Sequence, residues 1–483
     1  MTRRSPVSPA PGPLEDYAHG FDDLFGARAQ RQAFRRYLEG LLLPAERNKT
    51  LTALANTEPV VGAQRKEAQS LQWFLSESTW AAEEINRRRI ELLLEDPATA
   101  PNERGVLIID ETGARKEGKK TAHVGRQYLS SIGKIDNGVV SVGSLWADER
   151  IYYPLEVDPY TPAHHFEGGK EDPRFRTKPR IALELVEAAV AGGIPFRAVV
   201  GDILYGEHRG FRKGLESKRI PYVLALKPSY AWYRPIGEPG TVEEVARSAR
   251  WDGPDDPGEW VKLTRTFRDG HTQEWWALEA ECRPFGKEKQ KRLVVATTDP
   301  AELPDLTSWY LLTNLPAPDS SRATESGPIP AEVAEVVRLY SLRSWVEQSY
   351  KQMKNSLGWA HYQVRSDPAI RRHWQLVCCA LSPSAGGRTS ASWRKKRRRE
   401  WFSKKRPPRA PPPQWSGGKR ETASCRHLLL CWPEALRKVR MWLEPYVMLW
   451  RYWKAYSEKP PPKELRRLLE RVFMGEGLYL YAH

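Results

Sequence analysis

The stretch GVLIID, residues 105–110, points to the fold and to the first candidate site residue. Its run of apolar residues predicts a short buried strand that ends at Asp110. Residues 196–200 predict a second buried strand, which ends in Gly201 and Asp202. Carboxylates at such positions face the crevice in which open α/β sheets bind ligands. An Asp at a strand end also often caps a helix or a turn, so that both interpretations stay open for each residue.

The residues around these two stretches alternate between strand and helix patterns. Residues 181–191 predict a helix closed by Gly192 and Gly193. Further strands are expected at three places, residues 139–142, 151–155 and 222–226. Strands separated by helical segments predict an α/β core with a mixed sheet flanked by helices. We assign this core to residues 105–226 and 330–380.

The rest of the chain divides by composition. The expected regions are a disordered N-terminus (1–20), a helical DNA-binding domain (21–100), a β-rich insertion (227–329), a basic low-complexity segment (382–426) and a helical C-terminal region (427–483). The helical pattern of the second region also fits a helical domain with nothing more than a charged, solvated face. The insertion is rich in Trp, Thr and Gly and has alternating stretches, which favour antiparallel strands.

The charge of the chain indicates a polyanionic partner. Its 483 residues include 76 Lys and Arg against 60 Asp and Glu, which gives a net charge of +16. A folded protein this basic usually binds nucleic acid or, less often, an acidic membrane surface. No run of apolar residues is long enough for a membrane span, and no apolar stretch follows the basic start, so we expect a cytoplasmic protein.

A third acid, Glu347, falls in a segment (331–357) whose pattern predicts one continuous helix. At about 100° per residue, five of its side chains form a stripe about 80° wide: Tyr340, Arg343, Glu347, Lys351 and Lys354. The stripe is either a solvated charged face or a phosphate-binding site with a metal ion. Three carboxylates that hold two Mg²⁺ or Mn²⁺ ions are suited to displacement at phosphorus.

Several blocks of the sequence resemble the insertion-sequence transposases of the DDE superfamily, whose core is RNase H-like. The spacing Tyr340-x2-Arg343-x3-Glu347-x6-Lys354 is similar to the YREK signature of one bacterial group. The other similar blocks are IIDETG (108–113), VGRQYLSSIGKIDNG (124–138), FRTKPRIALEL (175–185), VVGDILYG (199–206) and HYQVRSDPAIRRHWQLVCCA (361–380).

The resemblance implies roles for individual residues. Asp110, Asp202 and Glu347 would form the metal-binding triad for two ions, whereas Tyr340, Arg343 and Lys354 would contact phosphates of the transposon end. Lys351 joins these DNA-binding candidates through its place on the stripe. Trp309 lies where relatives stack a flipped base, although a buried Trp is the commoner role.

The implied activity is cleavage at terminal inverted repeats followed by strand transfer into target DNA, with or without a hairpin step. A homodimer on DNA and association with the bacterial nucleoid are expected by the same analogy. Two alternatives stay open: a transposase-derived DNA-binding protein without catalysis, and a general metal nuclease that needs no specific ends.

One stretch departs from the family pattern. After residue 381 an apolar helix is expected, but the chain continues with SPSAGGRTSASWRKKRRREW. Residues 394–409 contain ten basic residues and one acid. The net charge of this stretch is therefore more than half of the net charge of the chain. We hypothesise that two compensating frameshifts bracket residues 382–430; otherwise the segment is a basic arm.

Overall fold

The computed structural model describes residues 7–233, 239–267, 270–284, 291–320, 328–382, 432–457 and 459–473. The described chain splits into two compact units. The first draws its residues from the ranges 1–99, 355–363 and 375–483, and the second from 100–354 and 364–374. Because the chain enters the first unit three times, neither unit is a continuous stretch of sequence.

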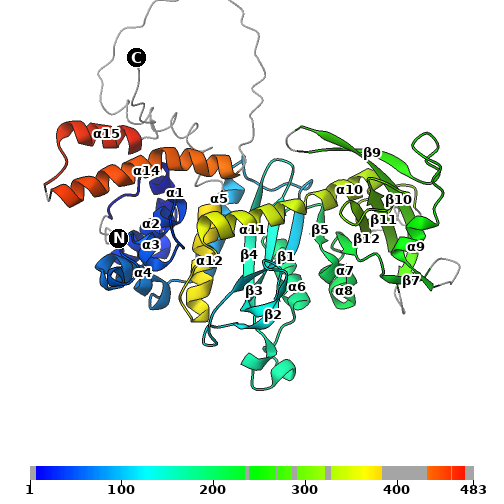
Figure 1. Cartoon of the computed structure of the whole chain (residues 1–483), viewed down its shortest axis with the longest axis horizontal. Helices are drawn as coiled ribbons and strands as arrows, with labels where there is room; N and C mark the ends of the chain where they lie inside the picture. Colours follow the sequence, from blue (N-terminus) through cyan, green and yellow to red (C-terminus); the bar gives the residue numbers. More distant parts are fainter. Residues whose placement is uncertain are drawn as a thin grey trace, which may run out of the picture. The chain divides into compact units, whose positions relative to one another are not determined.

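The second unit is built on a sheet of twelve described strands (Figure 1). Their order is β2-β3-β1-β5-β6-β12-β11-β10-β7-β8, with β4 beside β3 and β9 beside β10. The bounds are β1 Val106–Arg115, β2 Gly125–Leu129, β3 Lys134–Ala147, β4 Tyr152–Tyr160, β5 Ala198–Gly201, β6 Tyr222–Leu226, β7 Ala231–Tyr233, β8 Pro239–Thr241, β9 Val261–Thr266, β10 Thr272–Pro284, β11 Lys291–Thr297 and β12 Ser308–Thr313.

Among the described strands, β1, β5 and β6 run parallel to one another, and the other pairings are antiparallel. The α/β fold with a mixed sheet, predicted from the sequence, is therefore confirmed, and it is consistent with an RNase H-like core.

Strand β1 is longer than the sequence predicted. It continues past Asp110 to Arg115, because β3 pairs with it along its whole length, from Val106 opposite Ala147 to Arg115 opposite Gly138. The expectation that the strand ends at Asp110 is therefore wrong. The parallel pairing of β1 with β5 does end at this point, and its last pair is Ile109 with Gly201. Asp110 thus lies where β1 loses its neighbour on one side.

The strands of the β-rich segment continue the same sheet. Strand β12 pairs antiparallel with β6, which places Tyr310 opposite Leu226. Strands β11, β10 and β9 follow outward from β12. Residues 261–266 and 272–284 form a hairpin, as their alternation predicted, but the long-range pairing of β6 with β12 has no local signal in the sequence.

Helices of the second unit pack against this sheet (Figure 1). Helix α6 (Lys178–Ala191) lies on β1, β3 and β4; its first turn is capped by the Thr177 hydroxyl, and it ends at Gly192, followed by Gly193 with φ 66°. Helix α10 (Val333–Ser341) crosses β5, β6, β10 and β11. The short helices α7 (Ile203–Glu207), α8 (Arg209–Ser217) and α9 (Val242–Arg247) complete the unit.

Residues 331–357 do not form one continuous helix. Helix α10 ends at Ser341, and α11 begins at Ser344 and runs to Leu357. Leu342 and Arg343 lie in the turn between them, and Leu342 is buried. The prediction of an unbroken helical stripe is therefore wrong, because Tyr340 belongs to a different helix from Glu347.

The first unit is helical. Its elements are α1 (Pro13–His19), α2 (Arg28–Leu42), α3 (Leu51–Leu54), α4 (Lys66–Ser76), α5 (Ala82–Glu95), the end of α12 (Asp367–Leu381), α14 (Trp432–Tyr456) and α15 (Lys463–Phe473). The expectation that residues 1–20 are disordered is wrong for α1, because Leu14 and Tyr17 are buried and the Tyr17 ring packs on Phe21. The basic segment 382–426 lies outside the described residues, apart from Ser382. The division of the chain into domains stays a prediction.

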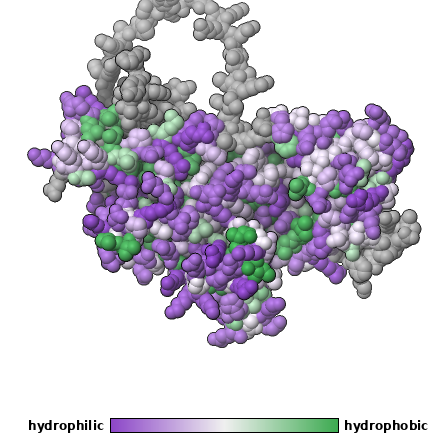
Figure 2. Space-filling view, viewed as in Figure 1, coloured by the Kyte–Doolittle hydropathy of each residue, from purple (hydrophilic) through white to green (hydrophobic). Residues whose placement is uncertain are grey.

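The surface in view is mostly hydrophilic, and hydrophobic residues form small separate patches (Figure 2). Such scattered apolar side chains are normal for a folded protein and do not indicate a docking surface. Within the described residues, no helix has the length and apolar character needed to cross a membrane.

Candidate active site around Asp110 and Asp202

The two aspartates are neighbours through the register of parallel strands. Ile109 of β1 is paired with Gly201 of β5, so the next residue of each strand is one of the two acids. Adjacent strands lie about 4.8 Å apart, which brings Asp110 and Asp202 together although 91 residues separate them in the sequence. Asp110 is 7% exposed. The structure therefore pairs a buried carboxylate with a half-buried one.

Burial and mutual repulsion disfavour the ionised form of this pair. Burial raises the pKa of Asp110 to about 7; Arg343 acts in the opposite direction, and the charge of Asp202 adds to the rise. Burial also raises the pKa of Asp202, again opposed by Arg343. Burial therefore disfavours ionisation of the pair, and a cation bound between the carboxylates would stabilise their charged form.

Asp202 also caps a helix, as the alternative interpretation of its position expected. Its Oδ1 accepts a hydrogen bond of 3.0 Å from the backbone N–H of Leu204 at the start of α7. The helix sits tightly on β6: a Cβ on Gly206 would lie 1.8 Å from the carbonyl oxygen of Ala225. Only glycine fits there, so Gly206 fixes the turn that carries Asp202. Capping and ligand binding use different lone pairs, so one role does not exclude the other.

Arg343 lies between Asp110 and Glu347. One terminal nitrogen of its guanidinium is 3.1 Å from Asp110 Oδ2, and the other is 3.1 Å from Glu347 Oε1. Burial alone would lower the pKa of Arg343, but the surrounding carboxylates, above all Asp110, raise it above its ordinary value. Its Nε is buried and has no hydrogen-bond partner in the part of the chain that the structure describes. The turn between α10 and α11 thus inserts one cation among the acids.

Helix α11 is fixed to β1 by two contacts close to the acids. The Tyr350 hydroxyl donates to the backbone oxygen of Asp110 at 3.1 Å, and the Lys354 ammonium donates to that of Gly113 at 2.9 Å. Burial lowers the pKa of Lys354 to about 8, against the attraction of Asp110. Glu347 is carried on this fixed helix, with its side chain 67% exposed.

The remaining sequence candidates differ in their surroundings. Tyr340 packs edge to face on Trp309, with ring centroids 5.0 Å apart, and burial raises its pKa to about 12 although Arg343 acts against the rise. Trp309 also contacts Trp275 at 4.6 Å. Lys351 is exposed on α11. The structure therefore brings Tyr340 and Trp309 together, while Lys351 stands apart from them on the surface of another helix.

Two of the three candidate carboxylates are placed to bind a divalent ion. Paired carboxylates such as Asp110 and Asp202 are the hard oxygen donors that Mg²⁺ and Mn²⁺ take. Glu347 is turned toward Arg343. Among the described residues, no group of three or more Asp, Glu, His or Cys side chains is arranged as a metal site. Two of the three expected ligands therefore fit a shared ion, and the third is separated from them by a guanidinium.

Sequence patterns missed three contributors to this region. Tyr350 shares α11 with Glu347 but has no distinctive spacing, and Gly206 is one glycine among many. Arg265, on β9, has its guanidinium carbon 4.5 Å from the Trp309 ring centroid. The alternation of residues 261–266 predicted a strand but could not indicate its neighbours, because the sheet order depends on pairings between distant segments.

Comparison with known proteins identifies the class to which this fold and site belong. Residues 20–279 match the family described as DDE superfamily endonuclease, and residues 177–382 match the family described as transposase DDE domain. The first match spans more than half of the chain, so the chain belongs to the DDE transposase family.

A curated relative agrees with this assignment. The chain is 31% identical over 371 residues to the "Probable transposase for insertion sequence element IS701" of Microchaete diplosiphon. The aligned region covers 77% of this chain and 86% of the relative. The chain is thus a transposase of an insertion-sequence family.

Proposed function

We propose that this transposase binds the terminal inverted repeats of its element and catalyses metal-dependent cleavage and strand transfer there. The observation that supports this most directly is the juxtaposition of Asp110 and Asp202 on neighbouring parallel strands. Asp110 is buried and Asp202 half-buried, and burial raises the pKa of both carboxyl groups. A site that concentrates uncompensated carboxylates is suited to bind cations and, through them, a phosphodiester.

Each acid has a part in the proposed site. Asp110 and Asp202 would hold Mg²⁺ or Mn²⁺ between them, and Glu347 would join as the third ligand once its contact with Arg343 is released. Two bound ions would supply activation of the attacking oxygen and stabilisation of the leaving oxygen. The contacts of Tyr350 and Lys354 with β1 hold α11, and hence Glu347, beside the strand that carries Asp110.

The cations near the acids would bind DNA. Arg343, released from the carboxylates, presents a planar fork that suits a phosphate. Tyr340 and Lys354 would contact the same strand, as the YREK-like spacing suggests, and Lys351 would add a weaker surface contact. Trp309 would stack on an unpaired base. Because two ends must be joined, we propose a homodimer on DNA, in association with the nucleoid.

One observation favours a second function, a DNA-binding protein without catalysis. The segment 382–430 departs from the family pattern and holds much of the net charge. If two frameshifts bracket it, this copy could bind DNA while its catalytic cycle fails. Translation of the other reading frames tests the frameshift hypothesis, which fails if no frame restores an apolar helix.

The experiment that separates the two functions uses Asp202→Asn on a duplex that carries the inverted repeat flanking the gene. We expect the wild-type protein to cut this duplex in Mg²⁺, and the variant to bind it in a gel shift without cutting. Cleavage by the variant at the wild-type rate would show that the catalytic site lies elsewhere. An inactive wild-type protein that still binds would favour the second function, and cleavage without any preference for the repeat would favour a general nuclease.

A further inference from the structure

The hairpin of β9 and β10 presents an aromatic cluster on one face of the sheet. Arg265 and Trp275 share this face, because Arg265 is paired with Gln273 and Trp275 with Leu263. Trp309 of β12 lies beside them, with its ring centroid 4.6 Å from that of Trp275. The cluster therefore combines three strands of the second unit.

A cation sits in the middle of these rings. The guanidinium carbon of Arg265 is 4.3 Å from the centroid of Trp275, 4.5 Å from that of Trp309 and 4.8 Å from that of Phe267. Three rings around one guanidinium restrict its orientation, since stacking on aromatic faces orders the planar group. Arg265 is thus held in place before any ligand binds.

The charge of Arg265 has no acidic counterpart among the described residues. Within the described residues, the Arg265 guanidinium has neither an acidic partner nor a hydrogen-bond partner. Burial lowers its pKa to about 10, so it still carries a positive charge at neutral pH. A half-buried cation without an anion loses hydration and gains only the attraction of the rings, which is the state that an incoming anion would stabilise.

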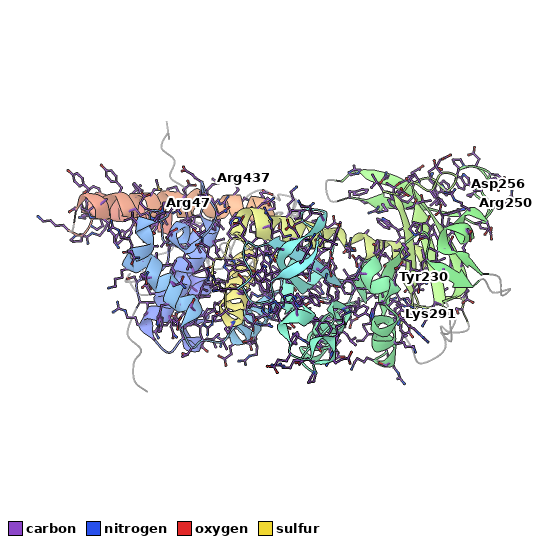
Figure 3. All side chains as sticks on the ribbon, turned by 60° about the horizontal axis from the view of Figure 1, so that its bottom comes forward. Arg47, Tyr230, Arg250, Asp256, Lys291 and Arg437 are labelled. Atoms are coloured by element: carbon purple, nitrogen blue, oxygen red, sulfur yellow. The ribbon has the colours of Figure 1, made fainter. Side chains whose placement is uncertain are left out.

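Other cations of the same segment differ in this respect. Lys262 is on the same strand but on the opposite face, where it pairs with Glu274 at 2.5 Å and lies over Trp276. Arg250, before β9, is bonded to Asp252 and Asp256, and Figure 3 shows it beside Asp256. Arg265 is therefore distinguished by the missing acid and not by its contact with an aromatic ring.

The cluster is connected to the acidic site through Tyr340. The Trp309 ring packs on Tyr340. Tyr340 lies three residues before Arg343, close enough to Arg343, Asp202 and Asp110 for their charges to act on its hydroxyl. Trp309 therefore links Arg265 to Tyr340 and, through Tyr340, to the surroundings of the acidic pair.

We propose that Arg265 is a phosphate-binding residue for the DNA strand that enters the active site, and that Trp275 and Trp309 position its guanidinium. This inference rests on the proposed function. It adds a contact with the DNA backbone to those proposed for the YREK-like residues. The Trp309 ring contacts Arg265, Trp275 and Tyr340, so it would orient the cation in addition to the base stacking proposed above.

The test is the salt dependence of DNA binding, because each lost phosphate contact lowers the slope of log Kd against log[salt] by about 1. Wild-type protein and Arg265→Gln are titrated in EDTA with a duplex of the terminal repeat and with one of unrelated sequence. We expect the variant to lose about one unit of slope on both duplexes, together with roughly tenfold in affinity at low salt.

Three further variants serve as controls. Arg265→Lys keeps the charge and should keep the wild-type slope, and Lys262→Ala should leave both slope and affinity unchanged. If Arg265→Gln does not fold, Arg265→Met, which retains the aliphatic packing, replaces it. A wild-type slope in the neutral variant would overturn the proposal even if affinity fell, because a purely structural role changes affinity without removing a phosphate contact. Since these titrations need no metal, their outcome is independent of whether Asp202→Asn still cuts DNA.

Discussion

Two groups of charges in the second unit differ in how completely they are neutralised. Around Asp158, each charge has partners: its carboxylate accepts from Arg176 and from Arg371, both at 2.7 Å. Arg371 also binds Asp367 at 2.7 Å, and Asp367 accepts from His123. Around Asp110 the ionised form is disfavoured instead, because burial raises the pKa of both Asp110 and Asp202 against the attraction of Arg343.

The difference between the groups separates structural from functional charge. A network in which each ion is paired stabilises the fold and needs no ligand. An unbalanced group costs stability unless something binds to it, so an imbalance that persists in the folded chain points to a ligand of the opposite charge. This criterion agrees with the proposals that the acid pair binds cations and that Arg265 binds a phosphate.

The largest effect is expected at Glu347. Replacement by Gln removes the third proposed metal ligand, so we expect cleavage of the terminal-repeat duplex to fall by more than about 100-fold, the upper range for residues that only support a ligand. Gln348→Ala, at the exposed neighbouring position of the same helix, should cut at nearly the wild-type rate. Equal rates for Glu347→Gln and the wild type would remove Glu347 from the site.

Arg371 should matter for stability instead. Arg371→Ala leaves Asp158 and Asp367 each short of one partner, so we expect a loss of roughly 2–3 kcal/mol in the free energy of unfolding, below the value for fully buried pairs because the network is partly exposed. Urea titration measures it. Arg180→Ala, which breaks an exposed pair with Glu184, should change stability by less than about 0.5 kcal/mol. A loss of DNA affinity in folded Arg371→Ala would argue against the separation of the two groups.

The acid pair should give stability a pH dependence when metal is absent. Because the pKa of Asp110 is raised to about 7, the folded state holds this proton more tightly than the unfolded state. The contribution of Asp110 to stability in EDTA should therefore be most favourable below the ordinary pKa of Asp and be lost as pH rises toward 7. Asp110→Asn removes this dependence, and we expect its unfolding free energy to decline by about 2 kcal/mol less than that of the wild type between pH 5 and pH 8. Parallel curves for the two proteins would contradict the raised pKa.

The smallest effect concerns Arg343. Arg343→Ala removes a cation that we propose to contact phosphate, so affinity for the terminal-repeat duplex should fall about tenfold in a gel shift. Circular dichroism should show that the variant remains folded. Unchanged affinity would limit Arg343 to neutralising the acids.

The sequence was sufficient for the strands that carry Asp110 and Asp202, because continuous apolar runs report burial directly. It did not reveal the break at Leu342 and Arg343, since helical periodicity continues across the turn. The contacts of Arg265 could not be predicted from the sequence either, because they depend on the pairing of β12 with β6 and of β9 with β10. The roles of the three acids and of the YREK-like residues stay predictions drawn from resemblance.

The central claim is that Asp110 and Asp202 together bind a divalent ion. Calorimetric titration of Mn²⁺ into metal-free protein tests it directly, with the double variant Asp110→Asn/Asp202→Asn as the comparison. We predict binding by the wild-type protein and loss of that binding in the double variant, which should remain folded. Equal Mn²⁺ affinity in the two proteins would contradict the account.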